Sequence, residues 1–193
     1  MPEAVVCITG ASGAQYGVRL IRILADHGWT IRLIVTGAGA INLDLECGIS
    51  PEDLASWEGV ILERNENLAG KSASGSSAID AYIVCPASGT TIGKIAAGIS
   101  DNLATRSALV AMKERRKLII VPREAPYSTP HLKAMFNLSE WGAVILPASP
   151  GFYQSPRSIE DLIDFVVARI LDQLDVEHSL GKRWTGEEVP AED

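Results

Sequence analysis

An arginine and a glutamate stand side by side where an apolar run ends. Arg123 and Glu124 follow Leu118 to Val121 and lie between Pro122 and Pro126. A carboxylate beside a guanidinium suits proton transfer next to a bound anion, and paired charges of this kind gather at active sites. A structural ion pair is the alternative. Both side chains are therefore candidates for a site at this end of the run.

Two segments rich in glycine and hydroxyl groups follow two other apolar runs. The first is Thr9 to Ala14 (TGASGA) and the second is Ser88 to Thr91 (SGTT). Each opens a helical pattern, and backbone N–H groups at the start of a helix bind anions such as phosphate. A glycine-rich turn also serves tight packing between a strand and a helix, which is the alternative for the first segment. Two such helix starts together suit a mononucleotide with a phosphate and a polar ring edge.

An arginine and a tyrosine near the C-terminal end add possible anion-binding groups. Arg169 lies three and four residues beyond Val166 and Phe165, on or beside the apolar face of a helix. An arginine there either binds an anion or extends its charged end to water. Tyr153 either packs as an aromatic or donates a hydrogen bond to phosphate. Lys113 at the end of another helical stretch has the ordinary place of a cation that complements a helix C-terminus.

The elements that must position these residues are short strands alternating with helices. Apolar, β-branched runs bounded by Gly, Ser or Pro predict five buried strands, and the stretches between them have helical periodicity. This alternation predicts a doubly wound parallel sheet with helices on both faces, a flavodoxin-like or Rossmann-like three-layer α/β domain. The expected strands are Ala4 to Ile8, Thr30 to Val35, Ala81 to Val84, Leu118 to Val121 and Val144 to Leu146. The expected helices are Ala14 to His27, Ala38 to Cys47, Pro51 to Trp57, Thr91 to Ala97, Asn102 to Arg116, Pro130 to Trp141 and Ser158 to Leu174.

All the unusual loops fall at one edge of the predicted sheet. The segments 9–14, 36–39, 86–91, 122–126 and 147–153 each follow a strand, whereas the connections at the other edge are short and plain. Open α/β sheets bind ligands at the carboxyl ends of their strands. We expect residues 1–180 to form one domain with its site at this edge, and residues 181–193 to form a polar tail.

The common nucleotide-binding motifs fit less well. Gly10, Gly13 and Gly17 do not make the dinucleotide pattern GxGxxG, and the second strand ends at Thr36 without the acid that holds an NAD ribose. The segment 89–94 is one residue short of a Walker loop. His27, His131 and His178 have no ligand spacing, so we expect no metal site.

Composition narrows the class of partner. The net charge of -7 and the pI near 5.0 argue against nucleic acid and anionic membranes. No apolar run approaches the roughly 18 residues of a spanning helix, and no secretion signal precedes the first strand. The three cysteines lack CxxC spacing and are expected to be reduced thiols. A cytoplasmic protein that does not enter the membrane is the expectation.

Seven segments, in order along nearly the whole chain, closely resemble the UbiX-type flavin prenyltransferases. The resemblance covers about Val5 to Leu174 and is far more specific than any one motif. The segments are Thr9 to Ala14 with Tyr16, Ser74 to Ser77, Lys113 to Arg116, Val121 to Pro126, Gly142 to Pro147, Gly151 to Tyr153 and Asp164 to Arg169.

The resemblance implies a flavodoxin-like subunit of a homododecamer that binds FMN and dimethylallyl phosphate near subunit contacts. By position, the residues that would hold FMN are Gly10, Ala11, Ser12, Thr36, Ser88, Gly89, Thr90, Thr91 and Arg123. The residues that would surround the prenyl phosphate, some of them from a neighbouring subunit, are Arg106, Lys113, Tyr153 and Arg169.

The implied reaction transfers a dimethylallyl group to N5 and C6 of reduced FMN without a metal, and the product serves UbiD-type decarboxylases. Cations around the phosphate stabilise the charge that grows as the allylic C–O bond breaks. Closing the second bond requires proton movement, which Glu124 and Ser12 could share with the departing phosphate. Glu124 is the preferred acid or base.

Two positions depart from the expected family pattern, and two rival functions stay open. Thr36 stands where a serine is expected, and Leu68 appears where some relatives carry an aromatic, which puts the prenyl pocket and donor preference in question. A flavin-dependent decarboxylase of the phosphopantothenoylcysteine type would carry an Asn and a catalytic His that the segment 86–91 lacks. The second rival is a non-catalytic function, that of an FMN carrier or accessory subunit of a decarboxylase.

Overall fold

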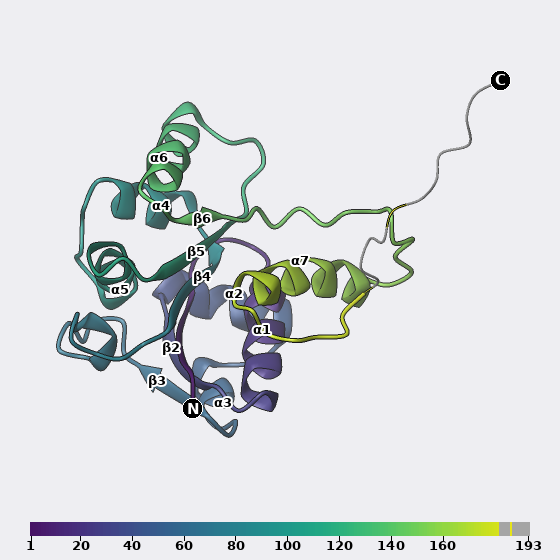
Figure 1. Cartoon of the computed structure of the whole chain (residues 1–193), viewed down its shortest axis with the longest axis horizontal. Coiled ribbons are helices and arrows are strands. Elements are labelled where there is room, and N and C mark those ends of the chain that lie inside the picture. The colour runs from purple at the N-terminus through teal and green to yellow at the C-terminus, as the bar shows by residue number, and fades with distance from the viewer. Residues whose placement is uncertain (182–185, 187–193) are drawn as a thin grey trace.

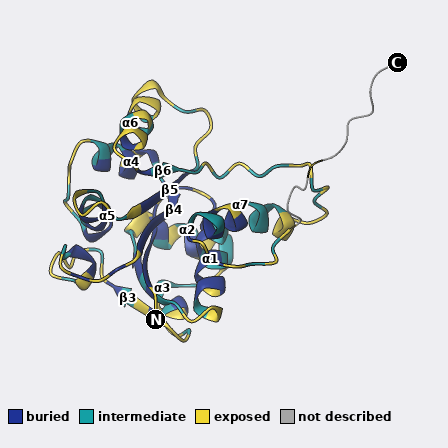
Figure 2. Ribbon diagram, viewed as in Figure 1, coloured by how far each residue is buried: buried dark blue, intermediate teal, exposed yellow. Residues whose placement is uncertain are grey.

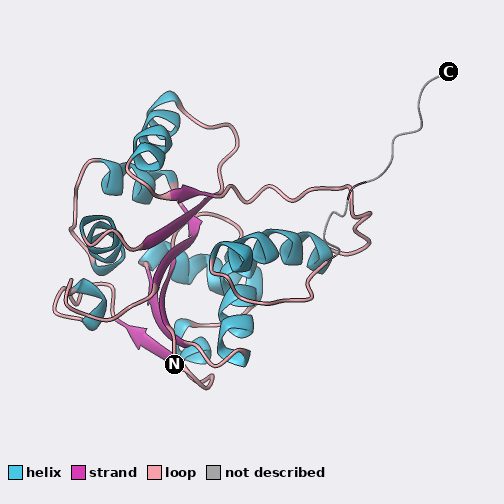
Figure 3. Ribbon diagram, viewed as in Figure 1, coloured by secondary structure: helices cyan, strands magenta, loops and turns pink. Residues whose placement is uncertain are grey.

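A computed structural model describes residues 1–181 and 186, and its centre is one parallel sheet of six strands (Figures 1 and 3). The strand order is β3-β2-β1-β4-β5-β6, and every neighbouring pair is parallel. The doubly wound parallel sheet predicted from the sequence is therefore confirmed. The strands are β1 Glu3–Ile8, β2 Thr30–Val35, β3 Val60–Glu63, β4 Ala81–Ala87, β5 Lys117–Pro122 and β6 Val144–Ile145.

The helices match the expected ones to within a few residues. Two helices begin with a serine cap, because Ser50 forms a capping box with Asp53 and Ser158 forms one with Asp161. A short 3-10 helix, η1 Lys71–Ala73, is an addition. The α-helices are α1 Ala14–Asp26, α2 Gly37–Cys47, α3 Pro51–Ala55, α4 Gly89–Ala96, α5 Leu103–Lys113, α6 Thr129–Glu140 and α7 Ile159–Gln173.

The sheet is the middle of three layers. All six residues of β1 are buried, so alternate side chains enter two separate cores. Ala4, Val6 and Ile8 join the core under α1 and α7, whereas Val5 and Cys7 join the core under α4, α5 and α6. Figure 2 shows the buried strands enclosed between helices whose outer faces are exposed.

The sequence analysis predicted five strands and did not predict β3. β3 has only four residues, its Ile61 is exposed, and it lies at the edge of the sheet. Such a short strand next to charged residues lacks the continuous apolar run of a central strand. Without β3 the order of the remaining strands is that of flavodoxin, and adding β3 beyond β2 gives the order of a dinucleotide-binding sheet.

The direction of winding reverses between β1 and β4. β1 leads to α1 on one face, whereas β4 leads to α4 and α5 on the other. The loops that leave these two neighbouring strands therefore diverge, and in doubly wound sheets ligands bind at such a reversal, at the carboxyl edge.

No helix in the described part of the chain is long and apolar enough to span a membrane. The tail predicted for residues 181–193 lies, apart from residues 181 and 186, outside the described residues.

Two helical glycines are expected to respond to alanine in opposite ways. A Cβ on Gly17 would lie 2.6 Å from the Cys85 carbonyl oxygen of β4, whereas a Cβ on Gly93 would meet nothing within 4 Å. Gly17→Ala should lower the free energy of unfolding by about 1–3 kcal/mol through overpacking. Gly93→Ala should raise it by up to about 1 kcal/mol through helix propensity. Urea denaturation of both variants checks this, and equal effects would contradict the close packing of α1 on β4.

Candidate active site

A buried threonine joins the two loops at the switch point. Thr9 is fully buried at the end of β1. Its hydroxyl donates to the carbonyl of Pro86, near the end of β4 (2.8 Å), and accepts from the N–H of Ser88, the first residue after β4 (2.8 Å). The loop 10–13 and the start of α4 are therefore held side by side at the carboxyl edge.

The loop after β5 meets the same place. The Arg123 Nε donates to the Ser12 carbonyl (3.1 Å), and the Arg123 N–H donates to the Ala87 carbonyl (3.4 Å). Ser12 and Arg123, chosen from separate sequence segments, are thus in contact. The Arg123–Glu124 ion pair, the structural alternative, is not among the ion pairs of the described residues.

Glu124 is exposed at this edge, where one carboxylate oxygen accepts from the Ala125 N–H (3.2 Å). Tyr127 lies close by, and burial raises the pKa of its hydroxyl above the ordinary value. A neutral phenol and an exposed carboxylate therefore flank the loop. This is a suitable place for a group that exchanges protons with a bound ligand.

Two helices begin at this edge with hydroxyl caps. The Thr36 hydroxyl accepts from the Gly39 N–H (3.1 Å) at the start of α2, and the Ser88 hydroxyl accepts from the Thr91 N–H (3.3 Å) at the start of α4. Each cap uses one of the N–H groups that a helix start leaves without a helical partner. The others are suited to a phosphate or a polar ring edge.

Close approach requires glycine at two of the expected cofactor-binding positions. A Cβ on Gly10 would lie 2.6 Å from the Cβ of Ala38 in α2. A Cβ on Gly89 would overlap the imidazole of His131 in α6. Ala11 is buried between these contacts, whereas Thr90 is exposed. Backbone, hydroxyl groups and small side chains therefore predominate at this edge, which suits a flat ring with a phosphorylated chain.

Glu46 is a member of the site that the sequence analysis missed. Its carboxylate in the last turn of α2 accepts from the N–H groups of Gly13 and Ala14 (2.8 Å each). These are N–H groups at the start of α1 that the sequence offered to a phosphate. An anion from the chain already occupies them, which directs a phosphate towards the starts of α2 and α4. Several acids in this segment look alike in sequence, and nothing in their spacing selects Glu46.

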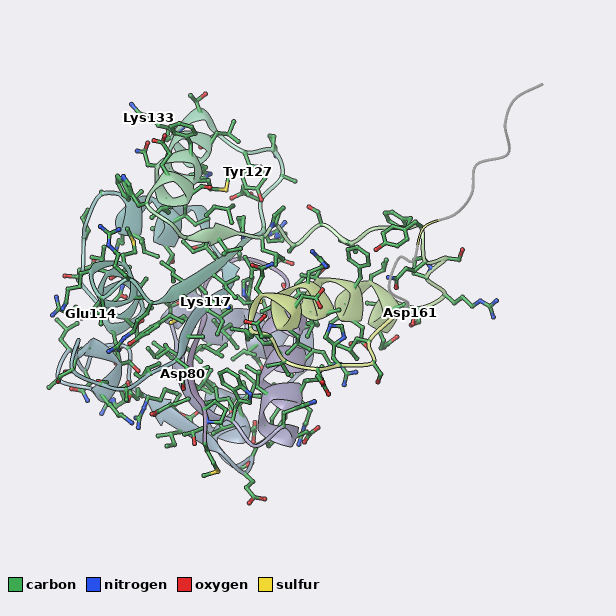
Figure 4. The ribbon with its side chains drawn as sticks, in the orientation of Figure 1. Asp80, Glu114, Lys117, Tyr127, Lys133 and Asp161 are labelled. Atoms are coloured by element: carbon green, nitrogen blue, oxygen red, sulfur yellow. The ribbon has the colours of Figure 1, made fainter. Side chains whose placement is uncertain are left out.

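Lys113 lies away from these loops in the same subunit, and Arg106 precedes it by about two turns on α5. α5 ends at Lys113, and β5 then begins at Lys117 at the amino edge of the sheet. The six residues of β5 separate this edge from Arg123, which at 3.3 Å per residue is roughly 20 Å. Figure 4 shows Glu114, next to Lys113, well apart from Tyr127, next to Glu124.

A far-edge patch surrounds Lys113, formed by Ser74, Gly75, Arg106, Lys113 and Arg116. The Arg106 Nε donates to the Ala73 carbonyl (3.4 Å), and the Arg116 Nη2 donates to the Gly75 carbonyl (2.8 Å). Lys113 forms an ion pair with Glu114 beside Gly75. The patch combines cations with the exposed hydroxyl of Ser74, a set that suits a phosphate.

Buried charges fix the loop that carries Ser74. Lys71 in η1 binds Glu3 (2.6 Å), and Arg32 binds Glu63 (2.6 Å) as well as Glu3. Burial alone would raise the pKa of Glu3, but hydrogen bonds from Lys71 and Arg32 outweigh it and hold that pKa below the usual range. Leu68 lies in this loop with an exposed side chain.

Tyr153 and Arg169 are organised by α7. Residues between β6 and α7 extend away from the sheet (Figure 1) and bring the Tyr153 ring edge-on to Phe165, with centroids 5.7 Å apart. Arg169 follows Phe165 by one helical turn and binds Asp172 (2.6 Å). The structure therefore sorts the expected site residues into three groups: the switch-point loops, the far-edge patch and α7.

Among the described residues, no group of three or more His, Cys, Asp or Glu side chains could hold a metal ion. Burial raises the pKa of the Cys7 thiol to about 12 and that of Cys85 further, so both remain protonated.

Replacing Glu46 tests its role in the loop. Glu46→Gln should lower the free energy of unfolding by about 0.5–1 kcal/mol, because a negative charge stabilises a helix N-terminus. Glu46→Ala should cost about 1–3 kcal/mol, because two buried N–H groups lose their acceptor. The exposed Glu58→Gln is the control and should change it by less than about 0.5 kcal/mol. Urea denaturation measures all three, and a Glu46→Ala protein as stable as the wild type would remove Glu46 from the site.

Known proteins share both this sequence and this arrangement. The Flavoprotein family matches residues 2–171. The flavin prenyltransferase UbiX of Pseudomonas aeruginosa is 42% identical over 95% of this chain and 94% of its own. The crystal structure of AnUbiX in complex with FMN and dimethylallyl pyrophosphate superposes with a TM-score of 0.93 at 35% identity, covering 97% of this chain and 99% of that one.

A second solved structure is a dodecameric FMN-dependent UbiX-like decarboxylase from Escherichia coli O157:H7. It has a TM-score of 0.92 at 38% identity and covers 95% of this chain and all of its own. Cysteine decarboxylases such as TvaF share the fold at 19% identity, with a TM-score of 0.62. The full-length matches, together with the switch-point loops, place the chain in the Flavoprotein family, and within it the chain belongs to the UbiX flavin prenyltransferases.

Proposed function

We propose that this protein transfers a dimethylallyl group from dimethylallyl phosphate to N5 and C6 of reduced FMN. The observation that carries the proposal is the contact between loops at the β1–β4 switch point, where Thr9 binds Ser88 and Arg123 binds Ser12 beside the exposed Glu124. A flavin site and an acid–base group meet there in a member of the UbiX family.

The residues proposed to hold FMN are those of the switch-point loops and the starts of α2 and α4. Backbone and hydroxyl groups bind the phosphate and the polar ring edge, and Arg123 adds a cation. Reduced FMN, when bound, supplies the electron-rich nitrogen and carbon that accept the allyl group. The set is Gly10, Ala11, Ser12, Thr36, Ser88, Gly89, Thr90, Thr91 and Arg123.

The donor phosphate is proposed to lie between subunits. Arg106 and Lys113 belong to the far-edge patch, which the length of β5 separates from the flavin loops of the same chain. They reach a flavin only if a neighbouring copy presents them. A homododecamer, the assembly named for the related structure from Escherichia coli, provides such neighbours. Arg169 on α7 and Tyr153 in the segment before it complete the set that neutralises the phosphate as the C–O bond breaks.

Glu124 is proposed to move the proton released when the second bond forms at C6. Its exposed carboxylate has water or ligand as its remaining partner, and Ser12 is linked to the same loop through Arg123. Enclosing the site by a second subunit would exclude water from the allylic cation.

The proposal also covers the domain organisation, the recipient of the product and the cellular location. We infer that residues 1–180 act as one FMN-binding domain and that the prenylated flavin passes to a UbiD-type decarboxylase. A cytoplasmic location is supported by three free cysteines, since thiols persist in reducing compartments.

Anaerobic incubation with reduced FMN and dimethylallyl phosphate tests the reaction, with mass analysis of the extracted flavin. The wild type should yield a flavin heavier by one dimethylallyl unit. Glu124→Gln should slow its formation by roughly 100-fold or more, the usual effect of losing a general acid or base, while FMN stays bound. Unmodified flavin with both the phosphate and the diphosphate donor would contradict the proposal and favour the FMN carrier.

The same assay tests whether the far-edge patch binds the prenyl donor. Lys113→Ala should raise the KM for the donor by about 10-fold or more without weakening FMN binding, since a charged hydrogen bond to phosphate contributes about 1.5–3 kcal/mol. Lys133→Ala, a cation elsewhere on the surface (Figure 4), is the control. An unchanged donor KM in Lys113→Ala would remove the far-edge patch from the site.

A further inference from the structure

An exposed arginine on α7 is bound by a partly buried aspartate, which in turn contacts a histidine. The Arg169 Nη1 donates to the Asp172 Oδ2 (2.6 Å), and the other oxygen of that carboxylate lies 3.2 Å from the His178 Nε2. The exposed side-chain fraction falls from 56% at Arg169 to 18% at Asp172 and 5% at His178. Arg169 is therefore the outermost of the three side chains, Asp172 lies beneath it, and His178 is the most deeply buried.

The hydrogen bonds assign the tautomer of His178. The Leu180 N–H donates to the His178 Nδ1 (3.3 Å), so Nδ1 is the acceptor nitrogen. In a neutral imidazole the other nitrogen then carries the proton, and Nε2–H donates to Asp172. Asp172 consequently accepts from the imidazole on one oxygen and from the guanidinium on the other, which fixes the plane of its carboxylate.

The C-terminal end of α7 brings His178 within hydrogen-bonding distance of Asp172. Asp175 has a positive φ of 56°, the Val176 N–H donates to the Leu171 carbonyl (3.1 Å), and the Asp175 N–H donates to that of Asp172 (3.3 Å). This is the pattern of a Schellman motif, in which the chain reverses after the helix. Val176 is buried in the core below α7, so the next residues run back along the helix and bring His178 to Asp172.

Arg169 lies on the part of α7 against which Tyr153, another expected donor-binding residue, packs. Phe165, Arg169 and Asp172 are spaced by four and three residues, which puts them on one face of the helix. Tyr153 packs edge-on against Phe165 at the start of that face. Tyr153 and Arg169 are therefore held by neighbouring turns of one helix.

We propose that Asp172 and His178 are positioning residues that hold Arg169 for the phosphate of the prenyl donor. A guanidinium has five N–H donors, so the bond to Asp172 leaves others for the phosphate. A long side chain held in one place loses less rotamer freedom when it binds. The inference rests on the proposed function, because it assigns Arg169 a partner in that reaction.

The test is the binding and use of dimethylallyl phosphate by the FMN-loaded protein. Asp172→Asn keeps the shape of the side chain but removes its charge, and should raise the donor KM by roughly 3- to 10-fold with kcat within about 2-fold. Calorimetry with oxidised FMN, where no turnover occurs, should show the same loss of donor affinity, with FMN affinity unchanged. Asp101→Asn, which breaks the exposed ion pair with Lys94, is the control.

Two further variants show whether the effect passes through Arg169. In an Arg169→Ala background, Asp172→Asn should change donor affinity no further. His178→Gln, which keeps an N–H donor, should bind the donor like the wild type, whereas His178→Leu should bind it less tightly. Thermal unfolding of each variant identifies any that fail to fold.

Each outcome has a separate meaning. An equal effect of Asp172→Asn with and without Arg169, or tighter donor binding in Asp172→Asn, would overturn the inference while leaving the reaction intact. A wild-type protein that makes no prenylated flavin would instead overturn the proposed function. Normal wild-type turnover together with an unchanged donor KM in Asp172→Asn defeats the positioning role alone.

Discussion

The hydroxyl of Thr9 is the contact on which the arrangement of the flavin loops depends. Parallel strands deliver their loops to one edge, but the sheet alone does not fix how two diverging loops sit against each other. Thr9 does so by binding both Pro86 and Ser88 from a fully buried position. Arg123 then ties the loop after β5 to Ser12, so that three strands contribute to one lining.

The parallel sheet also explains why Lys113 and the switch-point loops lie at opposite edges of one subunit. Helices that return the chain to the start of the next strand must end at the amino edge, and α5 takes Lys113 there. The ion pairs that join Glu3, Arg32, Glu63 and Lys71 hold the η1 loop at this edge. Cations on α5 are therefore suited to serve another copy, and a closed assembly with repeated contacts meets that requirement.

Much of this architecture was predictable because its signals are local. The runs around Val6 and Ile119 are apolar on both faces, as central strands must be, and Ser50 and Ser158 cap the helices that they precede. β3 was not predicted because an edge strand of four residues, with Ile61 exposed and Glu63 at its end, lacks the apolar run of a central strand. Ser12 and Arg123 were chosen from separate segments, and their contact confirms that these two loops share one edge.

The residues that sequence could not find act through tertiary contacts. Glu46 acquires its partners only when α2 lies across the start of α1, and Asp172 meets His178 only after the chain reverses at Asp175. Neither contact has a fixed sequence spacing. The separation of Lys113 from Glu124, both inside one continuous stretch of sequence, likewise follows from the length of β5.

The most direct test of the account is FMN affinity after the Thr9 hydroxyl is removed. Thr9→Val keeps the volume but leaves the Ser88 N–H and Pro86 carbonyl without their partner, which costs about 1–3 kcal/mol. Calorimetric titration should show FMN binding weakened by roughly 10-fold or more in Thr9→Val, and by less than about 3-fold in Thr9→Ser, which retains the hydroxyl. A Thr9→Val protein that binds FMN as tightly as the wild type would contradict the claim that this hydroxyl builds the flavin site.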